Sequence, residues 1–285
     1  VASDFSLPIN VKSETKAFSK VDIRSQTSEK VVNIGFKDGD YVNEGEVICQ
    51  LDSGERLANF KRAEIGFNSA KELSKKGLSS QSSLVAAETT FEQARIALER
   101  TNIAAPFGGF VDNLAKEGQL LQNGQICASL VSLSPLKIVG NVSELVVSKI
   151  KPGQPVKIKL ISGEEFETAV TFVASTADSQ TRTFRVESEL PNEQSSVKDG
   201  LTGEMTIFTD SQKAHFIPTS AFLLADNGDV ALATVMNSVI RIYTVQILID
   251  TVAGAWVTGL PQEANIVVAG QGFVKEGEEV NSVSR

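Results

Sequence analysis

Few residues in this sequence suit reactive chemistry. The 285 residues include two cysteines, two methionines, one histidine and one tryptophan. Soft-metal sites need several sulfur ligands at one point, and catalytic sites need nucleophile, base and orienting groups together. Nucleophile-elbow, phosphate-loop and His-Glu-x-x-His zinc motifs do not occur. We therefore expect a protein that is not an enzyme and that holds no cofactor and no metal.

Basic charge and long apolar runs are also scarce. The sequence has 27 Lys+Arg against 35 Asp+Glu, a net charge of −8, so a nucleic-acid partner is not expected. No run approaches the roughly 18 apolar residues of a membrane-spanning helix. The chain starts at Val1 without a basic segment followed by an apolar one. We expect that a secretory signal or lipid anchor, where the protein has one, is not part of this chain.

One stretch of the chain occurs twice. Residues 37–51 return as residues 116–130, with Gly39 matching Gly118 and Gly45 matching Gly124. Glycines at such positions favour turns with positive φ between short strands. Upstream, Val32 aligns with Val111, and Lys30 stands where the second copy has Gly109, so we expect that turn to differ. Each copy is too small to bury an apolar face alone, which predicts one interlocked β-sandwich.

The two copies are separated by a segment with helical periodicity. The first arm has Phe60, Ala63, Phe67 and Ala70 at spacings of three and four, and the second continues the pattern through Leu84, Ala87, Phe91, Ala94 and Leu98. Large and small residues alternate along both arms, as in knobs-into-holes packing, which predicts an antiparallel hairpin. Asp52 and Glu55 form a possible capping box, Gly77 ends the first helix, and Ser79 or Ser80 begins the second. Two ordinary amphipathic helices lying on a globular core are the alternative.

The cysteines fall out of step in the repeat. Cys49 aligns with Ala128, and Cys127 aligns with Ile48. Adjacent strand residues face opposite sides of a sheet, so we expect two buried, unpaired thiols rather than a disulfide. A disulfide remains the alternative, and two cysteines do not identify the redox compartment.

The rest of the chain has the pattern of β-strands. Short apolar runs are separated by turn-rich segments, as in a small barrel. These runs are 7–11, 18–23, 136–142, 156–160, 166–174, 183–190, 205–209, 230–236 and 239–249, with a short helix expected over 143–151. His215 is expected to have a structural role in a strand or domain crossing, and Trp256 to be a packing residue.

Several motifs resemble one family, in the family's order. Residues 101–109, Thr-Asn-Ile-Ala-Ala-Pro-Phe-Gly-Gly, match its Thr-x-Ile-x-Ala-Pro-Phe-x-Gly return into the lipoyl-like domain. Residues 181–183, 201–205 and 217–222 are similar to later motifs. The chain resembles the membrane fusion proteins, which are the periplasmic adaptor subunits of tripartite efflux pumps.

The resemblance implies a fold and its domains. It implies a mostly β protein with an α-helical coiled-coil hairpin, elongated, with four modules in line. These are the hairpin, 53–102; a lipoyl-like β-sandwich, 23–52 and 103–133; a small β-barrel, 14–22 and 134–212; and a membrane-proximal β-domain, 1–13 and 213–285.

The resemblance also implies partners and a contact surface. We expect a non-catalytic adaptor in the periplasm, associated with the inner membrane. It would self-associate as a ring, hexameric in the family, and join an inner-membrane transporter of the resistance-nodulation-division (RND) type to an outer-membrane channel of the TolC type. The hairpin tip would contact that channel through Leu73, Gly77, Leu78 and Ser79, whereas Ser69 stands near the family's arginine position.

Other functions remain open from the sequence. Leu73 could instead pack between the arms, and Ser79 could only cap a helix. The adaptor could serve an ATP-driven exporter, or it could deliver metal, although only Met205, Met236 and His215 would suit soft metals besides the cysteines. A lipoyl or biotinyl carrier needs a lysine between the two half-motifs, and Asp52-Ser53-Gly54 supplies none.

Overall fold

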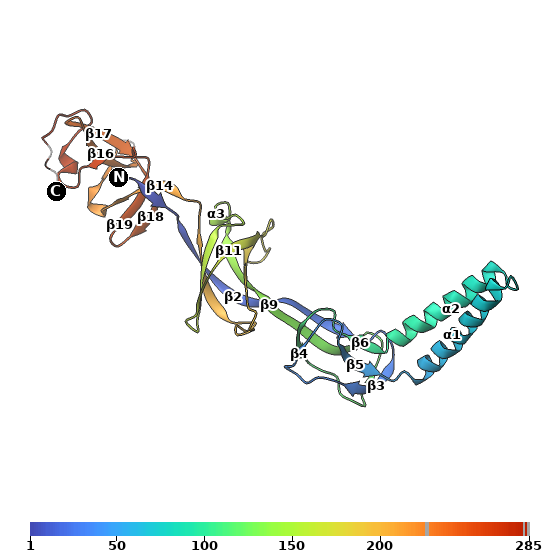
Figure 1. The fold of residues 1–285 in the computed structure, drawn as a ribbon. Helices are drawn as coiled ribbons and strands as arrows, with labels where there is room; N and C mark the ends of the chain where they lie inside the picture. The colour runs from blue at the N-terminus through green and yellow to red at the C-terminus, as the bar shows by residue number, and fades with distance from the viewer. Residues whose placement is uncertain (226–227, 282, 284–285) are drawn as a thin grey trace. The chain divides into compact units, whose positions relative to one another are not determined.

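The fold is mostly β with one helical hairpin, as the sequence predicts (Figure 1). The computed structural model describes residues 1–225, 228–281 and 283. The chain divides into two compact units, each built from segments that are far apart in sequence. The first unit comprises Val1–Ser13, Val139–Ser188 and Thr202–Arg285, and the second comprises Glu14–Ile138 and Glu189–Leu201.

The second unit contains the repeated stretch as a β-sandwich. Its short strands are β3 (Glu29–Ile34), β4 (Tyr41–Val42), β5 (Val47–Leu51), β6 (Asn102–Ala104), β7 (Gly109–Asp112) and β8 (Leu120–Leu121). Two long strands, β2 (Pro8–Arg24) and β9 (Ile126–Ser143), contribute residues to both units. The sequence predicted two separate runs where β2 is continuous. Exposed and buried residues alternate along the first half of β2. This alternation is typical of a strand, and it continues at positions where the buried side chain is polar, so the strand is not interrupted there.

The turns of the repeat have the predicted conformation. Gly39, Gly45, Gly118 and Gly124 have φ of 93°, 84°, 84° and 87°. These values lie in the left-handed region, which a Cβ disfavours. The repeat is therefore real in three dimensions as well as in sequence.

The two copies hydrogen-bond to each other across the sandwich. Gly39 donates to the carbonyl of Val111 (2.8 Å), and Gly118 donates to the carbonyl of Val31 (2.9 Å). The structural equivalent of Val111 is therefore Val31, which is buried, and the alignment with the exposed Val32 was wrong by one residue. The pairing of β3 with β5 shifts just after Val31, so the first copy has one more residue than the second.

The expectation of free thiols was also wrong. Cys49 and Cys127 form a disulfide, with their Cα atoms 6.5 Å apart. The pairing of β5 with β6 shifts between Val47 and Cys49, so alternation fails and both Ile48 and Cys49 are fully buried. On β9, Cys127 is likewise buried within a continuously buried stretch. Both sulfur atoms therefore reach the same sandwich core.

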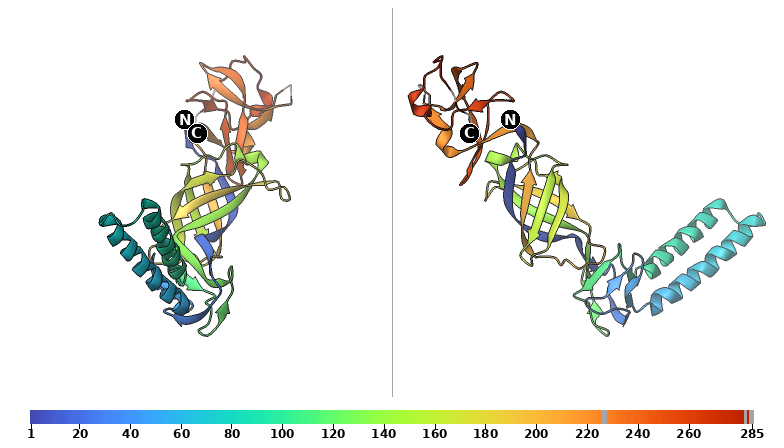
Figure 2. Two further views of the ribbon diagram at one scale, coloured as in Figure 1. Left: turned by 90° about the vertical axis from the view of Figure 1, so that its right-hand side faces the viewer. Right: turned by 60° about the vertical axis from the view of Figure 1, so that its left-hand side comes forward.

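The hairpin is formed by α1 (Gly54–Lys75) and α2 (Gln81–Glu99), which run side by side (Figures 1 and 2). The structure describes both helices in full, and no residue in either is fully buried. The half-buried positions include every residue of the predicted contact line, here called the seam: Phe60, Ala63, Phe67, Ala70, Leu84, Ala87, Phe91, Ala94 and Leu98. The ring of Phe91 lies 5.4 Å from that of Phe60 and 5.4 Å from that of Phe67. The coiled-coil interpretation is confirmed, and the helices do not lie on a globular core.

The first unit contains a β-barrel. The strands β10 (Pro155–Leu160), β11 (Glu165–Val173), β12 (Thr183–Leu190) and β13 (Thr202–Phe208) join β2 and β9 in the order β12-β11-β10-β13-β2-β9. An additional pairing of β12 with β9 closes the barrel. The expected short helix is α3 (Glu144–Val147). The barrel core is apolar and includes Ile158, Met205 and Ile207, each with no exposed surface.

The remaining part of the first unit has two small sheets. One has the order β1-β14-β19-β18, formed by Ser3–Phe5, Gln212–Ile217, Gly254–Thr258 and Gln246–Thr251. The other contains β15 (Phe222–Leu224), β16 (Val230–Met236), β17 (Val239–Thr244) and β20 (Asn265–Ile266), with 3₁₀ turns at Thr219–Ala221 and Gln271–Phe273. Trp256 stacks on Phe5 at 4.4 Å, and the buried His215 hydrogen-bonds through Nε2 with the carbonyl of Pro261 (2.9 Å). Both residues pack within the fold.

Candidate functional site at the hairpin tip

The tip is the turn between α1 and α2, here residues 73–80. Gly77 has φ of 69°, which lets the chain leave α1 in the left-handed conformation. Its amide donates to the carbonyl of Ser74 (2.9 Å), and the amide of Leu78 donates to the carbonyl of Leu73 (2.9 Å). These two bonds are those of a Schellman motif, so the helix ends in a fixed turn rather than a frayed one.

The tip brings together all four residues predicted from the sequence. Leu78 is 72% exposed and Leu73 is 46% exposed. Leu73 is therefore not a seam residue. Ser79 does not cap the return helix, because Ser80 has that role and accepts a hydrogen bond from the amide of Ser83 (3.2 Å). The Ser79 hydroxyl contacts only the neighbouring Ser80 carbonyl (3.5 Å) among the described residues.

The start of α1 differs from the predicted capping box. The helix begins at Gly54 after Ser53, whose side chain makes no cap hydrogen bond. Asp52 accepts a hydrogen bond from the amide of Gly54 (3.0 Å), two residues on, which is an Asx-turn contact. The predicted capping box is therefore not formed: Asp52 bonds an amide two residues on and not one three residues on.

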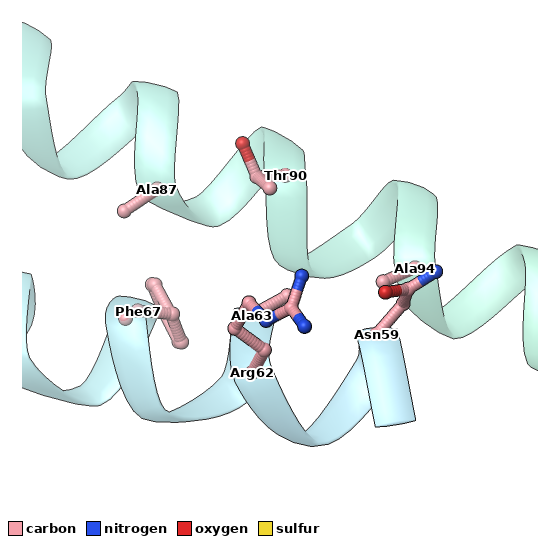
Figure 3. Close-up of a pocket in the computed structure, with 8 residues that line it drawn as sticks. Asn59, Arg62, Ala63, Phe67, Ala87, Thr90 and Ala94 are labelled. Carbon is pink, nitrogen blue, oxygen red and sulfur yellow. The ribbon is translucent and has the colours of Figure 1, made fainter. Parts of the chain in front are cut away.

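A groove of about 410 Å³ runs along one flank of the hairpin (Figure 3). Small side chains line it, including Ala63 and Gly66 of α1 and Ala87 and Ala94 of α2. In Figure 3, Arg62 reaches from α1 toward α2 across this groove. The flank is therefore a second accessible surface of the hairpin, distinct from the tip.

The base of the hairpin is held by a contact that sequence reasoning missed. Arg56, in the first turn of α1, donates through Nη2 to Thr27 Oγ1 and to Glu29 Oε1, the latter at 3.2 Å. The Arg56 and Glu29 side chains are 27% and 32% exposed. In the second copy the place of Glu29 is taken by Gly109, since Glu29 pairs with Leu121 as Gly109 pairs with Val42. The earlier alignment of Lys30 with Gly109 was wrong by the same single residue.

The two copies need different residues here for physical reasons. A Cβ on Gly109 would lie 2.7 Å from the carbonyl oxygen of Val131, so glycine is required. In the first copy, the hairpin helix α1 lies next to this position, and Glu29 forms an ion pair with Arg56 of that helix. The missed signal was a charged residue at a repeat position where the other copy has glycine.

Arg56→Ala is expected to loosen the hairpin base. A charge-assisted hydrogen bond at a partly buried site contributes about 1–2 kcal/mol. The amides of Leu51 and Asp52, which donate to the carbonyls of Thr101 and Lys30, should then exchange with solvent about tenfold faster. Hydrogen exchange read by NMR measures this. Arg100→Ala, an exposed arginine at the end of α2, is the control. Equal acceleration in both variants would contradict a specific role for Arg56.

Two further kinds of site were expected to be absent from the sequence, a metal site and a membrane-spanning helix. Among residues 1–225, 228–281 and 283, no group of three or more His, Cys, Asp or Glu side chains is placed to hold a metal ion. In that same part of the chain, no helix has the length and apolar character needed to cross a bilayer.

Comparisons with known proteins agree with this architecture. The model of the RND membrane fusion protein barrel-sandwich hybrid domain matches residues 19–133. The model of the CusB-like β-barrel domain matches residues 138–211. The first match lies within the second unit, and the second match covers the barrel of the first unit.

Similar proteins include a multidrug resistance protein and a periplasmic linker of a solvent efflux pump. The multidrug resistance protein MexA of Pseudomonas aeruginosa is 24% identical over 323 residues, covering 99% of this chain and 83% of MexA. The solvent efflux pump periplasmic linker SrpA of Pseudomonas putida is 24% identical over 317 residues, covering 99% of this chain and 83% of SrpA.

A solved structure shares the fold. The crystal structure of a MacA-MexA chimera, containing the hairpin of Pseudomonas aeruginosa MexA, superposes with a TM-score of 0.66 at 21% identity, covering 76% of this chain and 87% of the chimera. The repeat, the hairpin, the barrel and the two domain matches agree, and this chain belongs to the RND membrane fusion protein family.

Proposed function

We propose that this chain is a periplasmic adaptor that links an inner-membrane efflux transporter to an outer-membrane exit duct. Its function is to assemble with these partners and not to catalyse a reaction. The observation that carries the proposal is the tip: a turn fixed by two backbone hydrogen bonds that exposes Leu78. Leu73 is exposed on the same fixed turn, and two exposed leucines together suit a contact with another protein. The names of the relatives, which include a periplasmic linker of an efflux pump, support the same role.

The disulfide supports the proposed compartment. Structural disulfides persist in oxidising compartments such as the bacterial periplasm and are rare in the cytosol. A buried bond between Cys49 and Cys127 is therefore consistent with folding outside the inner membrane. Association with that membrane would come through the transporter.

The charge distribution of the hairpin supports self-association as a ring. Helix α1 has five basic and three acidic side chains, whereas α2 has one basic and three acidic. When copies are arranged head to tail, α1 of one copy faces α2 of the next, and opposite net charges then meet. We propose six copies, as the family resemblance implies, with an RND transporter as partner and an ATP-driven exporter as the alternative.

Changes at the tip are expected to abolish export without unfolding the protein. Leu78→Asp or Ser79→Arg places a charge on the proposed duct contact, whereas the turn is held by backbone atoms. Each contact contributes little alone, but a ring multiplies the loss by the number of copies. The variants should express and crosslink to the transporter at wild-type levels. The cells should lose export, measured as drug susceptibility or dye efflux.

Gln93→Arg, on the exposed face of α2, is the matched control and should export normally. Equal loss of export from this variant and the tip variants would move the duct contact to the flanks of the hairpin. Full export by the tip variants would remove the duct-docking role altogether.

A further inference from the structure

The second unit contains a pocket that shares no residue with the proposed duct contact. It has a volume of about 530 Å³ and lies where β4 and β7 meet the segment 132–134 of β9 and the loop 193–195. All of these residues belong to one compact unit. Sites for small organic molecules in proteins have volumes of about 300–1,000 Å³, and this pocket is within that range.

One wall of the pocket is a loop fixed by a buried side chain. Asn192 is 4% exposed, and its amide nitrogen donates to the carbonyls of Leu133 and Val197, both at 2.9 Å. Its side-chain oxygen accepts from the amide of Val197 (3.2 Å), and its carbonyl accepts from the amide of Ser195 (2.8 Å). The loop that carries Glu193 is thereby tied to β9. A wall fixed in advance lowers the ordering cost of binding a ligand.

A second wall is aromatic. Tyr41 and Phe110 pair across β4 and β7, with their rings edge to face at 5.3 Å. A Cβ on Gly108 would lie 2.7 Å from the Tyr41 hydroxyl. The absence of a side chain at Gly108 therefore leaves the space that the Tyr41 hydroxyl occupies. Tyr41 nevertheless remains 55% exposed. These rings offer a surface for a flat aromatic group.

The polar groups of the pocket determine the charge of the ligand. Glu193 lines the pocket, and no residue in the described part of the chain forms an ion pair with it. Lys198 lies outside the lining, with Nζ donating to the Ser195 carbonyl (3.2 Å) and 5.7 Å from the Phe110 ring. Glu193 and Tyr41 line the same pocket, and a carboxylate and an aromatic ring both attract a cation, whereas the Phe110 ring already has Lys198 over it. We propose that this pocket binds a small, flat aromatic molecule that carries a protonated amine.

The test compares three indole probes that differ in charge. Tryptamine is cationic, indole-3-acetamide is neutral and indole-3-acetate is anionic at pH 7. Binding to the full chain is measured by isothermal titration calorimetry or by saturation-transfer NMR. For ligands of this size we expect a Kd for tryptamine of about 0.1–1 mM. Indole-3-acetamide should bind about fivefold more weakly, and indole-3-acetate should not bind detectably.

Two variants and a control separate the charge from the rings. Glu193→Gln should weaken tryptamine about fivefold and leave indole-3-acetamide unchanged, whereas Tyr41→Ala should weaken both. Glu44→Gln, at an exposed position of the same unit outside the pocket, should change neither. Equal binding of all three probes would overturn the charge assignment. No tryptamine binding at 5 mM, or binding unaffected by Tyr41→Ala, would overturn the site.

Discussion

Loss of the Cys49–Cys127 bond is expected to lower the free energy of unfolding of the second unit by about 2–4 kcal/mol. The bond joins residues 78 apart in sequence, and both sulfur atoms lie in the sandwich core. Chain-entropy arithmetic for a loop of this length gives about 4.5 kcal/mol, near the upper end of measured values. The hairpin is inserted inside this loop, so the bond joins the two half-motifs directly and independently of the helices. Urea unfolding of the Cys49→Ala/Cys127→Ala variant, followed by circular dichroism, measures the change.

Reduced wild-type protein is the matched control for that variant. It keeps both side chains and loses only the bond, so it distinguishes loop closure from the volume lost on substitution. Thiol titration supplies an independent check. Unfolded, unreduced protein should show no free thiols, and two should appear after reduction. Two titratable thiols in unreduced protein would contradict the disulfide and restore the expectation made from strand alternation.

The cysteines show where sequence reasoning stops. The glycines of the repeat were predictive, because a positive φ is a property of the residue and its turn. The pairing of Cys49 with Cys127 depends instead on bulges in β3 and β5, which break alternation. A bulge inserts one residue without a local composition signal, so an alignment of repeats can slip by one beside it. The same slip matched Val32, rather than Val31, with Val111.

The hairpin shows the opposite balance. Its seam could be predicted in full, because helical spacing places residues three and four apart on one face. Its attachment could not, because Arg56 contacts Glu29 of β3 and Thr27 just before that strand, and these residues meet Arg56 only in the folded unit. The pocket could not be predicted from the sequence for the same reason, because Tyr41 and Glu193 lie in distant parts of the sequence. The roles of Leu73, Gly77, Leu78 and Ser79 at the tip remain predictions.

Phe91→Asp is expected to separate the two helices of the hairpin while the β-sandwich stays folded. The Phe91 ring contacts Phe60 and Phe67, and it is the largest seam residue of α2. The substitution removes both ring contacts and places a charge between the arms. Because the seam is half-buried, we expect a cost of about 2–4 kcal/mol, below that of a charge in a closed core. Two-helix hairpins have little other packing, so helical circular dichroism at 222 nm should fall, with an earlier thermal transition for that signal alone.

Gln93→Asp introduces the same charge on the exposed face two residues away, and it should leave the helical signal unchanged. The sandwich provides an internal reference, because the amides of Val31 and Val111, bonded between the two copies of the repeat, should keep their slow hydrogen exchange in Phe91→Asp. That result would show that the two helices can separate while the sandwich at their base stays folded. Rapid exchange at Val31 and Val111 in the variant would instead mean that the helices and the sandwich unfold as one cooperative unit, and the hairpin could then not move independently.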